Sequence, residues 1–171
     1  MSAQAPRPTA EEPARATDLL REAPFAYVAM VDGARPYVLP MNFAYVATAA
    51  PAQGASCPVG RLHLHTGPGR KSVALADNPR VCVVVTADAT FDQGATPCDD
   101  GFAFRSVIVE GPATLLEDRT EREEALRTIL AKYDPGRADT PFDPDVLAQT
   151  LVYAVTVETI TYKELRPRGA D

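Results

Sequence analysis

The sequence predicts an α+β fold in which six or seven strands form an antiparallel barrel, with two to four peripheral helices. Segments rich in apolar and β-branched residues recur along the chain, and turn-forming residues separate them. The helical segments do not alternate with the strands, which disfavours a parallel sheet. Hydrophobic residues make up 46% of the 171 residues, enough for a core that needs no disulfide or structural metal.

The N-terminal segment combines a polar tail with a helix. Residues 1–8 are polar and proline-rich, and we expect them to be disordered. A helix is predicted from Thr9 to Ala23, because Thr9 and Glu12 have capping-box spacing and a proline follows.

A predicted hairpin comes next. Strands at 25–31 and 36–46 flank Asp32-Gly33, a strong tight-turn signal. Pro40 interrupts the second strand. Because proline has no N–H for the ladder, its position indicates a bulge, a sheet edge or a backbone segment that faces a ligand.

The rest of the chain supplies more strands than helices. Further strands are predicted at 61–66, at 80–88, at 102–118 as one long strand or two, and at 151–165. Helices are predicted at 70–77 and at 144–149. A further helix is predicted after a capping box formed by Thr120 and Glu123.

Charge and composition exclude several classes of partner. The net charge of −6 and the pI near 4.9 argue against nucleic acid or an anionic membrane as the main partner. No segment reaches the roughly 18 apolar residues of a membrane span, and the N-terminus has no apolar signal region. The three cysteines include no C-x-x-C pair. We therefore expect a cytoplasmic protein.

The segment HLHTGPGRKSVAL carries the clearest binding signal. A strand runs into a glycine-rich turn, and Arg70 and Lys71 follow where a helix begins. The N–H groups and positive dipole end of a helix N-terminus attract anions, and two cations add formal charge. This arrangement suits a monophosphate, although a solvated basic pair on a surface helix would show the same residues.

Three other residues are candidates for chemistry. Arg105 lies among apolar strand residues and needs an anionic partner, which a ligand or a carboxylate such as Glu110 or Asp88 could provide. His63 and His65 share a strand face with the spacing of a metal pair. The sequence shows no third ligand, so no metal site is predicted.

The order of four segments makes the sequence recognisable. LLREAPFAYVAMVDGARPYVLPMNFAYV, GRLHLHTGPGRK, NPRVCVVV and FRSVIVEGPATLLED together resemble the pyridoxamine 5′-phosphate oxidase-like, FMN-binding split-barrel superfamily. The resemblance spans about residues 15–133 and is nearest to the branch of nitroimidazole-resistance proteins. It implies one split-barrel domain over 9–167, FMN as cofactor and a homodimer with the flavin at the interface.

The resemblance also implies residue roles. The implied flavin contacts are Val38, Leu39, Pro40, Met41 and Asn42 along the ring, His65 and Thr66 at the ribityl chain and ring, Arg70 and Lys71 at the phosphate, and Arg105 and Ser106 from the dimer-related subunit. His65 is the candidate catalytic residue, as a substrate orienter or proton donor. The oxidases carry a cation near the position of Met41, which this chain lacks.

The function implied is an FMN-dependent oxidoreductase that passes electrons from a reduced nicotinamide or another donor to a small substrate, such as a nitroaromatic compound. The oxidases use a C-terminal Trp, and the chain has no Trp, which argues against pyridoxamine 5′-phosphate oxidase activity itself. The alternatives are a non-catalytic flavin-binding or sensor protein, and the same barrel with F420 or with haem bound by His63 or His65.

Overall fold

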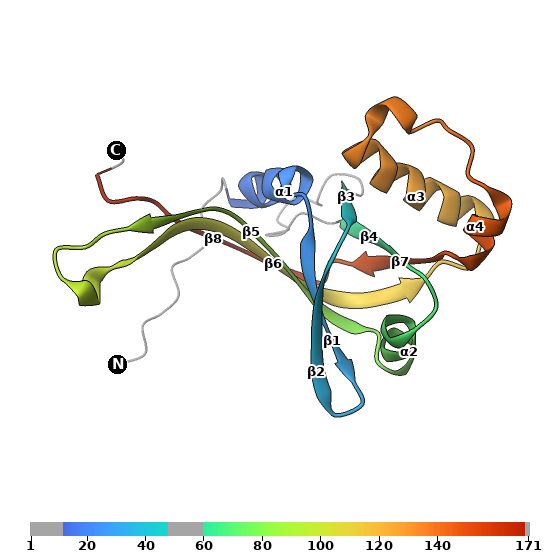
Figure 1. Ribbon diagram of the computed structural model, residues 1–171, viewed down its shortest axis with the longest axis horizontal. Helices are drawn as coiled ribbons and strands as arrows, with labels where there is room; N and C mark the ends of the chain where they lie inside the picture. The colour runs from blue at the N-terminus through green and yellow to red at the C-terminus, as the bar shows by residue number, and fades with distance from the viewer. Residues whose placement is uncertain (1–11, 48–59, 170–171) are drawn as a thin grey trace.

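The computed structural model describes residues 12–47 and 60–169, which form a mostly antiparallel α+β fold as expected (Figure 1). The strands are β1 (Ala26–Asp32), β2 (Arg35–Met41), β3 (Phe43–Ala47), β4 (Gly60–Thr66), β5 (Arg80–Asp92), β6 (Gly101–Leu115), β7 (Leu151–Thr156) and β8 (Thr159–Leu165). The helices are α1 (Glu12–Glu22), α2 (Arg70–Asp77), α3 (Arg119–Tyr133) and α4 (Pro144–Gln149), with short 3₁₀ turns at Pro97–Asp99 and Pro135–Arg137.

The sheet is a barrel that does not close. Its strands follow the order β2-β1-β5-β6-β7-β4-β3, and β8 pairs with β6 outside this path. The long strand β6 joins the two halves, because it pairs with β5 and β8 along its first part and with β7 at Ala113–Leu115. The strands β2 and β3, although consecutive in the chain, lie at the two ends of the order. This topology is the split barrel that the resemblance implied.

One face of most strands of the barrel packs into its interior. In β1 and β5 the side chains alternate between buried and more exposed positions, as expected for a half-buried strand. Helix α1 packs on β3, β5, β6 and β8 and buries Leu19 and Leu20 completely. Other fully buried side chains include Val28, Phe43, Leu62, Leu64, Val83, Val85, Val107, Val109, Val152 and Val155. Each contributes about 1.5–3 kcal/mol relative to an exposed position.

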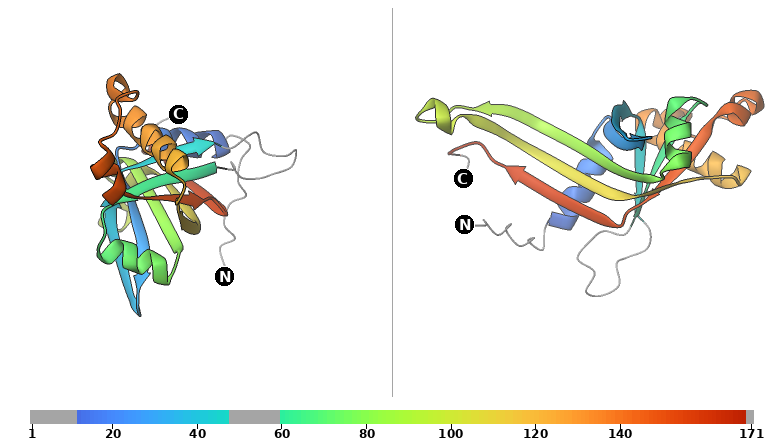
Figure 2. Two further views of the ribbon diagram at one scale, coloured as in Figure 1. Left: turned by 90° about the vertical axis from the view of Figure 1, so that its right-hand side faces the viewer. Right: turned by 90° about the horizontal axis from the view of Figure 1, so that it is seen from below.

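The strands β5 and β6 form a long arm that extends beyond the barrel (Figures 1 and 2). They are in register from Arg80 opposite Pro112 to Asp92 opposite Gly101, with one irregularity between Ala87 and Thr90. The arm is longer than expected, because the predicted strands end at residue 88 and begin again only at residue 102.

Two predicted strands are each divided in the structure. The segment 36–46 breaks at Asn42, between β2 and β3, and not at Pro40, which pairs with Tyr27 inside β2. Since β2 is an edge strand, the missing N–H of Pro40 is tolerated there. The segment 151–165 breaks at Val157 and Glu158, which is why eight strands are present.

Two of the predicted helices have the predicted bounds, and one predicted cap is wrong. Helices over 70–77 and 144–149 are confirmed. The cap of α3 is Asp118, whose carboxylate accepts a hydrogen bond of 3.0 Å from the Glu121 N–H, so the predicted capping box of Thr120 and Glu123 is wrong. The predicted tail at 1–8 and the Thr9 cap lie outside the described residues.

Candidate flavin site

The candidate phosphate site lies where β4 runs into α2. The turn Gly67–Gly69 separates Thr66, the last residue of β4, from Arg70, the first residue of α2. Gly69 has φ = +150°, a conformation that residues with a Cβ rarely adopt. The Ser72 hydroxyl accepts from the Gly69 N–H (3.0 Å) and donates to its carbonyl (2.8 Å). Helical geometry leaves the backbone N–H groups of the first turn of α2 without intrahelical acceptors. This first turn has no acidic residue.

Arg70 is held against the β1–β2 hairpin by two contacts. Its Nε donates to a carboxylate oxygen of Asp32 at 2.7 Å. Its guanidinium carbon lies 4.1 Å from the centre of the Tyr37 ring. These contacts bring Arg70 next to β2, the strand that includes Val38–Met41.

His65 precedes the same turn, in β4, and Lys71 follows it, next to Arg70 in α2. Both side chains are half-buried, and no carboxylate of the described residues lies within ion-pair distance of Lys71. Burial, and to a smaller extent the positive charge of Lys71, lower the pKa of His65. The lowered pKa favours the neutral imidazole at pH 7. Thr66 is buried, and its hydroxyl donates to the Gly67 carbonyl at 3.1 Å.

The strand β2 borders the candidate site mainly with its backbone. Leu39 is half-buried and Met41 is buried in the core, so only alternate residues face outward. The Val38 side chain is 60% exposed. Because β2 is an edge strand, its outer edge presents backbone groups that no strand of the described sheet pairs with. Asn42, exposed at the break before β3, ends this row.

Arg105 and Ser106 belong to a different part of the subunit. Arg105 is on β6, where Asp88 accepts a hydrogen bond from its Nε and Glu22 lies 3.4 Å from an Nη. The hydrogen bond to Asp88 raises the pKa of Arg105 further. Asp88 has φ = +56° at the irregularity of β5. Of the two carboxylates that the sequence suggests as partners, Asp88 forms an ion pair with Arg105. No described contact joins Arg105 and its carboxylate partners to the residues around α2.

His63 has a structural contact. Its Nδ1 lies 2.8 Å from the hydroxyl of Thr128 on α3. Because that hydroxyl donates to the Ala125 carbonyl at 2.7 Å, it accepts from His63, and Nδ1 carries the proton. Burial lowers the pKa of His63. Within the described residues, no group of three or more His, Cys, Asp or Glu side chains is arranged to hold a metal ion.

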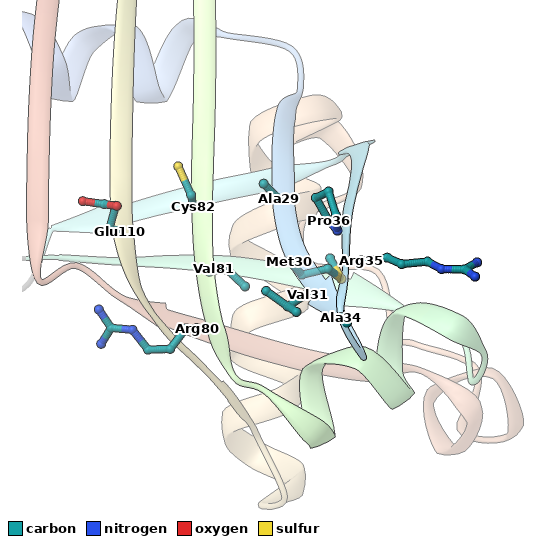
Figure 3. Close-up of a pocket in the computed structure, with 10 residues that line it drawn as sticks. All are labelled: Ala29, Met30, Val31, Ala34, Arg35, Pro36, Arg80, Val81, Cys82 and Glu110. Atoms are coloured by element: carbon teal, nitrogen blue, oxygen red, sulfur yellow. The ribbon is translucent and has the colours of Figure 1, made fainter.

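The sequence did not point to a pocket of about 480 Å³ on the outer sheet face (Figure 3). Ala29, Cys82 and Glu110 lie side by side across β1, β5 and β6, and the Cys82 and Glu110 side chains project to the same side. Burial and the Glu110 carboxylate raise the pKa of Cys82. A sign of this face is present in the sequence, because FAYVAMV and VCVVV are apolar at both alternating sets of positions. A strand with a solvated outer face needs apolar residues only at the set that points to the core.

The same outer face has large exposed apolar side chains. Tyr27 is 46% exposed, Ile108 is 40% exposed, and Val31 and Val38 are exposed beside them on β1 and β2. The register places Tyr27, Ala29 and Val31 on one face of β1, opposite Pro40, Val38 and Pro36 of β2. A cluster of exposed apolar side chains of this kind is typical of an interaction surface.

Comparisons with known proteins identify the family. Residues 12–164 match the family model described as pyridoxamine 5′-phosphate oxidase. No curated protein matches the sequence significantly. No helix within the described residues is long and apolar enough to cross a membrane.

Solved structures share the fold. A candidate 5-nitroimidazole antibiotic resistance protein from Bacteroides thetaiotaomicron has 24% identity and a TM-score of 0.70, over 89% of this chain and 83% of that one. The FAD- and haem-binding protein from Mycobacterium smegmatis has 24% identity and a TM-score of 0.76, over 92% and 73%. An FAD-binding protein from Mesorhizobium loti has 22% identity and a TM-score of 0.60, over 90% and 94%.

Proposed function

The chain belongs to the pyridoxamine 5′-phosphate oxidase family, and we propose that it is a flavoprotein that binds FMN. The observation that supports this proposal best is the cationic start of α2, where Arg70 and Lys71 lie beside the edge strand β2 and His65. A phosphate monoester carries nearly two negative charges at pH 7. Two cations and the free N–H groups of a helix N-terminus would bind it by charge-assisted hydrogen bonds.

The residues around this start also suit the rest of a flavin. The isoalloxazine ring would lie along the backbone of Val38–Asn42, with His65 and Thr66 at the ribityl chain. The similar structures from Mycobacterium smegmatis and Mesorhizobium loti are those of FAD-binding proteins, which supports a flavin ligand. We choose FMN because the two cations suit one terminal phosphate.

The protein would act as an oxidoreductase on a small substrate, such as a nitroaromatic compound. The bound flavin would supply the redox chemistry. The neutral His65 ring would keep one N–H that can donate a hydrogen bond to a substrate, and α2 would hold the phosphate end of the flavin. The similarity to a candidate nitroimidazole-resistance protein supports this substrate class.

The complete site would need a second copy of the chain. Arg105 and Ser106 lie apart from the residues around α2, and the outer sheet face with Tyr27, Ile108 and the 480 Å³ pocket is exposed. A homodimer would cover this apolar face. It would also bring Arg105 and Ser106 of one subunit to the flavin of the other.

The cofactor is tested on the purified protein. We expect the absorbance maxima of oxidised flavin, and FMN after release. Changing both Arg70 and Lys71 to Ala should weaken FMN binding by about 10- to 1000-fold, since charge-assisted hydrogen bonds are lost. Arg119→Ala with Arg137→Ala, which removes two exposed cations elsewhere, is the matched control. A Soret band, F420 fluorescence or unchanged FMN affinity would contradict the proposal.

Catalysis is tested under anaerobic conditions. Bleaching of the bound flavin by NADH or NADPH, followed by reoxidation with a nitroimidazole, is expected of the enzyme. If no electron donor bleaches the flavin, the protein is a flavin-binding protein without this activity.

A further inference from the structure

The two contacts of Arg70 leave part of its guanidinium group free. Asp32 bonds to Nε, and Tyr37 lies against the planar face. Neither terminal nitrogen, Nη1 or Nη2, forms a hydrogen bond with the described residues. An arginine binds a phosphate best through two parallel N–H donors, and these terminal donors remain available.

The same contacts restrict the motion of a long side chain. Arg70 is the first residue of α2 and is more than half exposed, so a free side chain would sample many rotamers. Asp32 begins the β1–β2 turn and Tyr37 lies on β2, so both partners belong to the hairpin whose strand β2 borders the proposed flavin site. A binding group that is already ordered loses less entropy when its ligand binds.

We infer that Asp32 and Tyr37 are positioning residues that hold Arg70 ready for a phosphate, and that they thereby set the preference of the site for FMN over riboflavin. This inference rests on the proposed flavin function. Asp32 acts here as an anchor and not as a competitor, because it occupies the Nε side and leaves the terminal nitrogens to the ligand. Riboflavin has the same ring and ribityl chain without the phosphate, so it reports every contact except those of the phosphate.

The experiment measures the dissociation constants of FMN and riboflavin for the flavin-free protein, and the FMN preference is their ratio. Tyr37→Leu removes the stacking face and Asp32→Ala removes the anchor; each should lower the FMN preference about two- to tenfold. Riboflavin affinity should stay within about twofold. Tyr37→Phe keeps the ring face and Asp32→Asn keeps an acceptor for Nε, so both should retain most of the preference.

Removing Asp32 also raises the net charge by one, which favours any anion. Glu123→Ala makes the same change in net charge, because it removes the carboxylate that pairs with Arg119 on α3. It should leave the FMN preference unchanged. A higher FMN preference in Asp32→Ala would show that Asp32 competes with the phosphate, and would overturn the inference. An unchanged preference in Asp32→Ala and Tyr37→Leu, or an equal loss for both flavins, would overturn it too. A wild-type protein without FMN preference would instead contradict the proposed phosphate site itself.

Discussion

Lys132 places its ammonium nitrogen 3.5 Å from the centre of the Phe43 ring and donates a hydrogen bond of 3.2 Å to the Leu20 carbonyl. The Leu20 carbonyl lies in the last turn of α1, where a cation also interacts favourably with the helix dipole. One side chain of α3 thus joins α1 to β3. Burial lowers the pKa of Lys132 to about 8, and no carboxylate of the described residues pairs with it.

The first prediction concerns stability against pH. The unfolded chain holds the Lys132 proton up to a pKa of about 10.5 and the folded chain only up to about 8, so between these values the unfolded state binds more protons. The free energy of unfolding should therefore rise with pH across this range, relative to Lys132→Met. Urea titrations of both proteins from pH 7 to pH 10 measure the difference. Parallel profiles would show that the charge is not desolvated.

The second prediction concerns the Tyr133 hydroxyl, which joins α3 to the start of β3. It accepts from the Phe43 N–H at 3.0 Å and donates to the Phe43 carbonyl at 3.2 Å. Tyr133→Phe removes both hydrogen bonds, which should cost about 1–3 kcal/mol in urea denaturation. Tyr153→Phe is the control, because the hydroxyl of this buried tyrosine has no hydrogen bond with the described residues. Equal losses in both variants would contradict the assignment.

The third prediction tests the point where β6 passes from one half of the barrel to the other. A Cβ at Gly111 would lie 1.9 Å from the backbone oxygen of Thr156, which cannot move aside cheaply. Gly111→Ala should lower the free energy of unfolding by roughly 3 kcal/mol or more, or prevent folding. Gly101→Ala, at the open end of the same strand, meets no atom within 4 Å and should change stability little. Similar thermal midpoints for the two variants would contradict this reading.

The sequence predicts the bounds of an element correctly where turn-forming or helix-breaking residues stand at its two ends. Helix α2 begins and ends as predicted because a glycine-rich turn precedes Arg70 and Asn78-Pro79 follows it. The division of 151–165 has no comparable local signal. It depends on hydrogen bonds from the Val157 N–H to the Gly60 carbonyl and from the Glu158 N–H to the Glu110 carbonyl, which join segments far apart in the chain.

The candidate site shows the same limit. The spacing of Arg70 and Lys71 in the sequence indicates a cationic helix start, but the contacts of Arg70 with Asp32 and Tyr37 cross more than thirty residues and follow only from the fold. The same holds for Arg105: the sequence suggests Asp88 and Glu110 as examples of a carboxylate partner, whereas the fold pairs it with Asp88 and Glu22.

The fourth prediction concerns the proposed dimer. Ile108 is exposed on the outer face of β6, so Ile108→Glu would bury a charge if a second copy covers this face. Light scattering should then show a monomer where the wild-type protein is a dimer, and flavin binding should be lost with it. Val146→Glu, on the exposed side of α4, should leave the mass unchanged. A dimeric Ile108→Glu protein would place the interface elsewhere.

The last prediction tests whether one flavin is shared by two subunits. Arg70 and Arg105 lie in separate groups of the subunit, so one flavin would contact Arg70 of one copy and Arg105 of the other. Arg70→Ala and Arg105→Ala homodimers should each bind FMN weakly at both sites. In a mixed dimer, one site receives both substituted residues and the other site receives neither.

The mixed dimer should therefore recover one tight FMN site per dimer, half the wild-type stoichiometry. Differently tagged variants, purified through both tags and titrated with FMN, give this number. A dimer of Arg70→Ala with Glu123→Ala, whose second substitution lies outside the site, is the comparison and should also show one tight site. If both arginines instead contacted the flavin of their own subunit, the Arg70→Ala and Arg105→Ala mixture would have no tight site, whereas the comparison dimer would keep one.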